Sequence, residues 1–346
     1  MVKNQKQIAA LFASLALCGF AAVPMTAQAG TDETASGKES KAVVEEAKKS
    51  YISGDLGVQF VTSYYSRGIL QGPQGQAGFD AQPYLDLYFQ LYAGTGFVDK
   101  VTLNLGLWSN IASDPSPGVN DPFRGGNGVE GRNGRLRNVR IGPVTAGLAS
   151  WTEFDWMPGV SFVFAKNFTL TTSYFEFDYP SQGASPQRSL NVSLAYDDTD
   201  LLGMWALHPH FTFLQELTGN ANGGHVGLGL ADTATSSSLG QYYEVGIAPA
   251  FTFMKDSKYA PTLTIPVTAG FGSSGFYGTG FGYASAGLTV SVPLAFIPSG
   301  FGSWTANFGG TYYYLGKNTA RANAQYSNGF ADHDAGVGFA GIGLTF

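Results

Sequence analysis

The feature that most constrains the fold of this 346-residue chain is an alternation of side chains that returns twelve times. In "VTLNLGLW", residues 101–108, valine and leucine alternate with threonine, asparagine and glycine. Successive side chains of a strand point to opposite faces, so a period of two predicts strands whose faces meet different surroundings. We place these runs at residues 54–65, 80–92, 100–112, 151–164, 168–179, 189–197, 201–217, 241–254, 259–273, 282–296, 302–316 and 335–346.

The polarity of the two faces indicates a membrane rather than water on the outside. One face of each run is apolar and uncharged, and the other carries Thr, Ser, Asn, Gln, Gly and a few acids, in a chain with only 13% charged residues. A soluble sandwich or lipocalin-like barrel, the alternative, has a charged outer face and a core of large aliphatic side chains. Backbone groups in lipid must all be paired, so a sheet crosses a bilayer only when it closes. We therefore predict an all-β fold, a transmembrane antiparallel up-and-down barrel of about 12 strands.

The connections between the runs alternate in length. After the even-numbered runs they are short, as in "AKN" and "KDSK", and after the odd-numbered runs they are mostly longer, the longest being residues 113–150. Short turns at one end and long loops at the other are typical of outer-membrane barrels. The pattern predicts short periplasmic turns and long extracellular loops.

The first 53 residues differ from the rest. Residues 1–29 have two lysines, an apolar run and Ala27-Gln28-Ala29, which predicts a cleaved signal peptide, with a membrane anchor as the alternative. Cleavage would remove the chain's one cysteine, so disulfides would not stabilise the exported protein. Residues 30–53 form a polar periplasmic segment with a possible short helix, and 54–346 form the barrel domain.

The charge balance argues against nucleic acid as a partner. The whole chain has 19 basic and 25 acidic residues, and residues 1–29 contain two of the basic ones, so the mature net charge is 17 minus 25, or −8. Phosphate backbones attract basic proteins.

The last run, ending at Phe346, predicts the seam of the barrel. Ala340, Ile342, Leu344 and Phe346 share one face, which we assign to lipid, and the run would pair with residues 54–65. A terminal Phe also resembles the signal by which outer-membrane proteins are recognised for assembly. The barrel assembly machinery is accordingly an expected partner.

Aromatic residues near the run ends predict girdles at the membrane interfaces. They are Tyr64, Tyr65, Trp151, Trp156, Tyr242, Tyr243, Trp304, Tyr312, Tyr313 and Tyr314. One run departs from the scheme, because its parity sets Glu176 outward. A bulge near Ser173, or a strand end above the membrane, would resolve this.

The phase of the strands also predicts which polar side chains face the lumen. These candidates are Asp86, Glu153, Asp155, Glu216, Glu244, His208 and His210. The long loop holds Arg124, Arg132, Arg135, Arg137 and Arg140, which would oppose the wall carboxylates and select solutes if the loop folds inward, or remain solvated if it does not. Two imidazoles without a third ligand do not predict a metal site, and we expect no cofactor.

Two stretches resemble a known family. "VTSYYSRGILQGPQGQ", residues 61–76, and "LGLWSNIAS", residues 105–113, are similar to the opening of the TorF family of porins, with Thr62 and Ser63 standing where Ser and Asp are usual. The matching residues are Tyr64, Arg67, Gly68, Ile69, Ser109 and Asn110. The resemblance implies a Gram-negative outer-membrane barrel. Arg67 would either guard the pore mouth or pair with an acid such as Asp80.

Taken together, these patterns predict a channel in the outer membrane of a Gram-negative bacterium. It would pass small hydrophilic solutes by passive diffusion and would contact outer-membrane lipid and lipopolysaccharide. We expect no enzymatic activity. An outer-membrane lipid hydrolase and a non-conducting adhesin or structural anchor stay open as alternatives, as does the oligomeric state.

Overall fold

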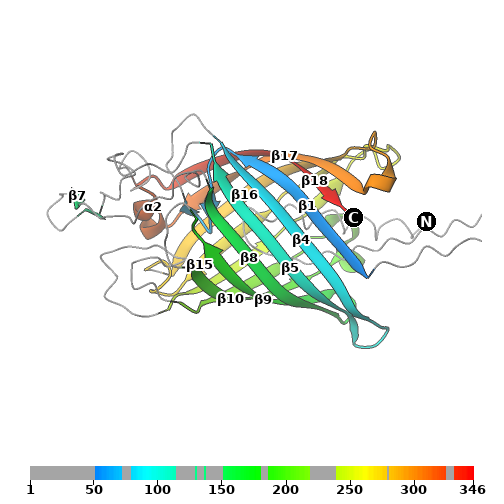
Figure 1. Cartoon of the computed structure of the whole chain (residues 1–346), viewed down its shortest axis with the longest axis horizontal. Helices are drawn as coiled ribbons and strands as arrows, with labels where there is room; N and C mark the ends of the chain where they lie inside the picture. The colour runs from blue at the N-terminus through cyan, green and yellow to red at the C-terminus, as the bar shows by residue number, and fades with distance from the viewer. Residues whose placement is uncertain are drawn as a thin grey trace, which may run out of the picture.

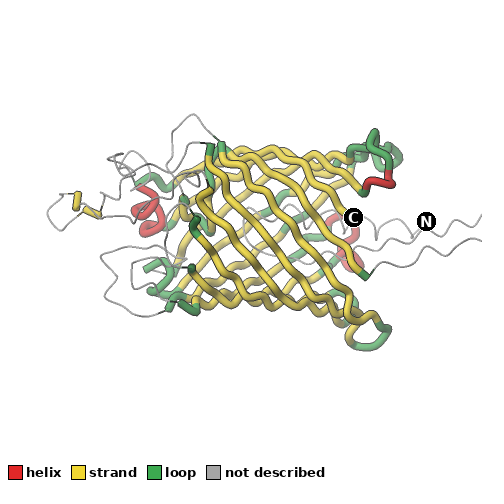
Figure 2. Tube along the Cα trace, viewed as in Figure 1, coloured by secondary structure: helices red, strands yellow, loops and turns green. Residues whose placement is uncertain are grey.

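A closed wall of antiparallel strands makes up most of the protein (Figures 1 and 2). The computed structural model describes residues 51–71, 79–113, 151–180, 186–218, 239–278, 280–324 and 331–346, together with the backbone of 129–130 and 136–137. The predicted signal peptide, nearly all of the predicted polar segment that follows it, and the side chains of the long-loop arginines lie outside the described residues.

The wall consists of fourteen strand segments in one sheet. They are β1 (Ile52–Val61), β4 (Asp80–Ala93), β5 (Val98–Ala112), β8 (Trp151–Phe164), β9 (Phe168–Asp178), β10 (Gln187–Tyr196), β11 (His210–Glu216), β12 (Gln241–Ile247), β13 (Ala250–Thr252), β14 (Thr262–Thr264), β15 (Val267–Gly272), β16 (Phe281–Pro293), β17 (Ser303–Leu315) and β18 (Asp334–Thr345). The other elements are the hairpin strands β2 (Tyr65–Ser66) and β3 (Ile69–Leu70), the pair β6 (Val129–Glu130) and β7 (Leu136–Arg137), the helices α1 (Thr199–Leu202) and α2 (Lys317–Ala324), and 3₁₀ turns at Gly203–Trp205 and Ser299–Phe301.

Two prolines explain why fourteen segments make twelve strands across the described wall. β12 continues into β13 past Pro249, and β14 continues into β15 past Pro266. Proline has no N–H to give to a ladder, so regular pairing stops there. Their carbonyls still accept hydrogen bonds from neighbouring strands, from Ile265 N at 3.0 Å and from Gly287 N at 2.8 Å. The predicted antiparallel barrel of about 12 strands is confirmed.

The seam between the first and last strands is also where the sequence places it. β1 and β18 pair antiparallel from Asp55 opposite Thr345 to Val61 opposite Phe339. Beyond the ladder, Gly54 and Phe346 exchange two main-chain hydrogen bonds of 2.9 Å. Phe346 and Ile342 are exposed on the outer face, as predicted.

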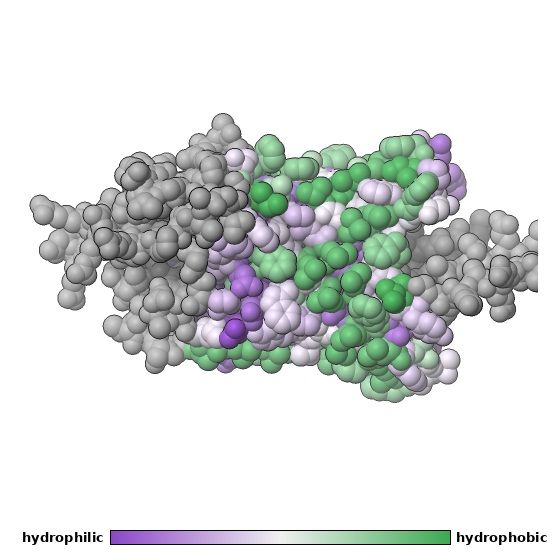
Figure 3. Space-filling view, in the orientation of Figure 1, coloured by the Kyte–Doolittle hydropathy of each residue, from purple (hydrophilic) through white to green (hydrophobic). Residues whose placement is uncertain are grey.

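The two faces of the wall have opposite polarity. Outward side chains such as Leu103, Leu194 and Val245 are exposed, and Figure 3 shows apolar side chains spread over the visible wall. Their inward neighbours Thr102 and Ser193 are buried. The arrangement is the reverse of a soluble barrel, whose inner face is apolar.

The run predicted at 201–217 is only partly a strand. Residues 199–205 form α1 and a 3₁₀ turn, and β11 begins at His210. The Asp198 carboxylate accepts hydrogen bonds from the N–H groups of Leu207 and His208, which folds this connection back on itself. In the described residues, no helix is both long and apolar enough to cross a membrane.

Glu176 faces outward without any bulge. The register of β9 against β10 runs unbroken from Gln187 opposite Phe177 to Tyr196 opposite Phe168, so the proposed bulge near Ser173 is wrong. Glu176 instead accepts a hydrogen bond from Arg188 Nε at 2.8 Å on the neighbouring strand. This charge-assisted pair allows the inward–outward alternation of side chains to continue to the loop end of β9.

The seam yields a stability prediction. Deleting Phe346 removes both hydrogen bonds with Gly54, and each such bond contributes roughly 0.5–1.5 kcal/mol. We expect the deletion to lower the folded fraction after refolding into detergent micelles, measured as the heat-modifiable band on a gel. The matched control Phe346→Leu keeps the backbone bonds and should refold like the parent chain. Equal yields for the deletion and the parent would contradict the prediction.

Candidate functional site

A hairpin that leaves the wall after β1 is the main structural feature of the loop end of the barrel. β2 and β3 pair through Tyr65 opposite Leu70 and Ser66 opposite Ile69, with Arg67 and Gly68 as the two turn residues. Both turn residues have positive φ, 51° and 76°, as a tight type I′ turn requires. A Cβ on Gly68 would lie 2.9 Å from Tyr283 Cβ, so the turn also needs glycine for space.

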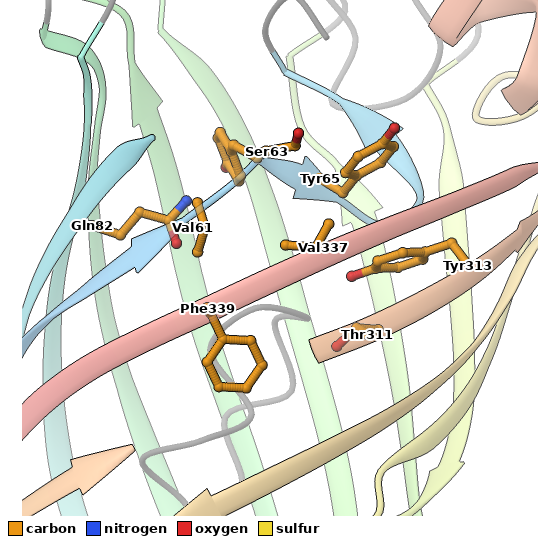
Figure 4. A pocket seen from close by; sticks show the side chains of 9 residues that line it. Val61, Ser63, Tyr65, Gln82, Thr311, Tyr313, Val337 and Phe339 are labelled. Atoms are coloured by element: carbon orange, nitrogen blue, oxygen red, sulfur yellow. The ribbon is translucent and has the colours of Figure 1, made fainter. Parts of the chain in front are cut away.

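The hairpin packs inward against the wall rather than out into solvent. Tyr65 stacks on Tyr313 with ring centroids 5.4 Å apart, and both side chains are buried. Ile69 and Leu70 belong to a buried apolar cluster that includes strands β11, β12, β16, β17 and β18. Figure 4 shows Tyr65, Val61, Val337 and Tyr313 around a small cavity of about 10 Å³, which is room for one water molecule at most.

Arg67, at the tip of the hairpin, lies among aromatic and acidic side chains. It is only 3% exposed, and its guanidinium carbon lies 5.8 Å from the Phe177 ring centroid and 5.5 Å from that of Tyr242. Cations are attracted to aromatic faces at such distances. The guanidinium also acts electrostatically on the Glu153 and Asp155 carboxylates of β8.

Tyr64 joins the hairpin to the same acids. Its hydroxyl donates to Glu153 Oε1 at 3.2 Å, and its ring lies 5.1 Å from that of Trp108. Burial raises the pKa of Tyr64 well above its usual range, and the Glu153 and Asp155 carboxylates raise it further, so the phenol stays a neutral donor. We call Tyr64, Arg67, Glu153, Asp155, Phe177 and Tyr242 the mouth cluster.

A second polar network lies beside the mouth cluster. The Glu244 carboxylate accepts hydrogen bonds from the hydroxyls of Tyr242 and Tyr283, the latter at 2.8 Å. His210 Nε2 lies 3.8 Å from Glu244 Oε1 on the adjacent strand. Buried carboxylates are costly without donors, and here two phenols supply them.

The structure places most of the predicted lumen residues on the inner wall. Glu153, Asp155, Glu216 and Glu244 are buried there. Asp86 is half-buried, opposite Asp55 across the β1–β4 ladder. Two of these carboxylates, Glu153 and Asp155, lie within electrostatic reach of Arg67.

His208 does not share the inward face with His210, and this expectation is wrong. His208 lies in the connection before β11 with φ 49°, where its Nδ1 is 3.6 Å from Asp197 and 3.9 Å from Asp198. The turn that Asp198 organises takes His208 off the strand. Within the described ranges, no three His, Cys, Asp or Glu side chains gather as metal ligands would.

Several aromatics assigned to interfacial girdles lie inside instead. Tyr64, Tyr65, Tyr242 and Tyr313 are buried, whereas Trp156, Tyr312 and Tyr314 are exposed on the outer face. The first run ends as a wall strand at Val61, so Tyr64 and Tyr65 belong to the hairpin. Tyr242 turns inward because it shares the parity of Glu244.

Sequence reasoning also missed the hairpin itself. The signal was present, because "YYSRGIL" sets Arg-Gly between short flanks, and a two-residue turn ending in glycine is a hairpin signature.

The sequence offers Asp80 as an acid that could pair with Arg67. In the structure, Arg67 lies near Glu153 and Asp155, and Asp80 accepts a hydrogen bond from Asn110 Nδ2 at 3.4 Å.

Fold and site together define the class: a closed barrel with an apolar outer face, a polar inner face and a charged cluster at its loop end. No protein-family model matches the chain, and no curated protein matches it, so the TorF resemblance stays a prediction.

Several solved structures are similar to most of the chain. The NanC porin is 8% identical over 84% of this chain and 100% of its own, with a TM-score of 0.42. OprB of Pseudomonas putida is 11% identical over 85% and 94%, with a TM-score of 0.38. The transport unit of the autotransporter AIDA-I from Escherichia coli is 9% identical over 88% and 93%, with a TM-score of 0.36. Likenesses of this size carry no conclusion about function.

The turn geometry yields a prediction for Gly68→Ala. Its positive φ costs an L-residue about 1–2 kcal/mol, and the added methyl meets Tyr283. We expect a lower midpoint in the thermal loss of the folded, heat-modifiable form. Gly96→Ala is the matched control, because nothing lies within 4 Å of its added Cβ. Identical midpoints for the two variants would show that the turn does not constrain residue 68.

Proposed function

We propose that the protein is an outer-membrane channel through which small hydrophilic solutes diffuse passively. The observation that carries the proposal is the reversed polarity of the closed wall, exposed Leu, Val and Phe outside and Asp, Glu, Ser, Thr and Asn inside. An apolar outer surface of this extent is stable in lipid, and a polar inner wall suits water and polar solutes.

The closed ladder supports the membrane part of this proposal. Backbone groups in a bilayer find no water, so each must pair within the protein. Here every wall strand pairs with two neighbours, and β1 with β18 removes the last edge. Outer-membrane lipid and lipopolysaccharide would surround the wall, and the barrel assembly machinery of a Gram-negative bacterium would insert it.

The mouth cluster would limit what passes. The hairpin narrows the loop end, and Arg67 and two carboxylates are buried near one another there, so a permeating solute would pass through the electrostatic field of both signs of charge. Side chains of opposite sign in a constriction select by size and charge. The long-loop arginines stay candidates for the same role, outside the described residues.

Single-channel recording of the refolded protein tests the proposal. We expect discrete conductance steps in planar bilayers and swelling of liposomes with small sugars and amino acids. The hydrolase alternative requires ester hydrolysis without steps, and the adhesin or anchor requires neither. Histidines of the described residues contact acids or a carbonyl: His208 by Asp197, His210 by Glu244, and His333 by the Leu315 carbonyl.

Arg67 provides the selectivity prediction. A unit charge about 7 Å from a permeating ion interacts by roughly 0.6 kcal/mol in water, a factor of about three in local ion concentration. The cation is enriched and the anion depleted by this factor, so we expect Arg67→Gln to raise the cation-to-anion permeability ratio about sevenfold, measured as a reversal potential in a salt gradient. Arg188→Gln removes the same charge from the outer face and should leave the ratio unchanged. Equal shifts for the two variants would count against a role for the mouth cluster.

A further inference from the structure

We propose that Asn323 of α2 is a positioning residue that holds Arg67 in the mouth of the barrel. The inference rests on the proposed channel function, since the position of Arg67 matters only if solutes pass it. It assigns the selectivity of the mouth to a residue 256 positions away in sequence, the difference between 323 and 67.

The side-chain amide of Asn323 binds the hairpin at two points. Asn323 Nδ2 donates to the Gly68 carbonyl at 2.9 Å, and the Leu70 N–H donates to Asn323 Oδ1 at 3.0 Å. The amide thus pairs with the hairpin as a neighbouring strand would, one donor and one acceptor on each side. Asn323 is itself 6% exposed, so water does not readily replace these bonds.

α2 gives this amide a fixed position. Thr319 Oγ1 donates to the Gly282 carbonyl at 2.7 Å, and Asn318 Nδ2 donates to the Tyr277 carbonyl at 3.0 Å. Ala320 and Ala322 are buried in the apolar cluster that also contains Leu70. The helix is therefore attached to the start of β16 and to the turn before it, and its inner face meets the hairpin.

Tyr277 supplies a second hold on the same turn. Its hydroxyl donates to the Arg67 carbonyl at 2.8 Å, and its side chain is fully buried. Burial raises the pKa of Tyr277 well above its usual range, so the phenol remains a donor. The carbonyls of both turn residues and the Leu70 N–H are thus bound by groups from the last third of the chain.

The hairpin needs such help because its own pairing is small. Each of its strands has two residues, and an isolated hairpin is marginal in water even when longer. The turn at Arg67 and Gly68 also occupies positive φ. We call the hydrogen bonds that Asn323 and Tyr277 make with the hairpin the clamp. Without the clamp, the backbone would no longer hold the guanidinium firmly between Phe177 and Tyr242.

The first test is a double-mutant cycle on selectivity. Asn323→Leu is close in size and leaves the Gly68 carbonyl and Leu70 N–H unpaired. We expect its cation-to-anion permeability ratio to rise toward that of Arg67→Gln, and the double variant to show no further rise. A residue that only stabilises the barrel would not share its effect with Arg67.

The second test uses trypsin at the Arg67–Gly68 bond. Arg67 is buried, so cleavage there reports departure of the hairpin from its seat. We expect Asn323→Leu and Tyr277→Phe to be cut after Arg67 about tenfold faster or more, with the product identified by mass spectrometry. Tyr243→Phe is the matched control, because its hydroxyl bonds Gln241 on the half-buried outer side of β12, away from the hairpin.

The outcomes separate the two proposals. A folded Asn323→Leu with the parent's permeability ratio and trypsin resistance would overturn the role of Asn323, even if the parent conducts. Absence of conductance in every variant would overturn the proposed channel function. The trypsin assay would still test whether Asn323 and Tyr277 hold the hairpin in place. If Asn323→Leu gives no heat-modifiable form, Tyr277→Phe decides, and its equality with Tyr243→Phe in both assays would refute the positioning.

Discussion

Closure of the β1–β18 ladder is the constraint on which the rest of the structure depends. Once Asp55 pairs with Thr345 and Gly54 with Phe346, the described wall has no free edge, and its apolar outer face no longer needs to be covered by protein. Strand parity then sets every second side chain inward. The polar lumen is thus a consequence of closure combined with a period of two.

Closure also creates a problem at the loop end, where the hairpin turns into the barrel. Its turn places main-chain N–H and C=O groups in a buried environment. Such groups must find hydrogen-bond partners within the protein. Asn323 and Tyr277 provide them from loops that reach the mouth from β17 and β15. Residues near both ends of the chain meet there because β1 and β18 are neighbours in the closed sheet.

The sequence predicts the wall far better than the mouth, for a physical reason. Strands such as 151–164 and 168–178 were predicted almost to the residue, because two contrasting environments impose alternation along their full length. The seam was predicted for the same reason. No such repeated constraint acts on residues 62–71, where two residue pairs and a two-residue turn decide the structure.

The errors have a common origin, since each arises where a side-chain hydrogen bond decides the local structure. At His208 and Tyr64 it overrides the alternation, and at Glu176 it lets the alternation continue. His208 leaves the strand because the Asp198 carboxylate binds backbone N–H groups at 207 and 208. Tyr64 is not part of an interfacial girdle, because its hydroxyl donates a hydrogen bond to Glu153 and the backbone turns inward after β1. Glu176 keeps its parity because Arg188 lies opposite it.

The clamp on the hairpin has a consequence for how selectivity is encoded. Arg67 supplies the charge, but its position depends on an amide in α2 and a phenol before β16, so the property belongs to three segments that the sequence separates widely. In the proposed channel, a change in the loop after β17 would therefore alter permeation without changing any charged residue of the lumen. In the channel that we propose, selectivity at this mouth would depend on hydrogen bonds to main-chain atoms as much as on the charge that they hold in place.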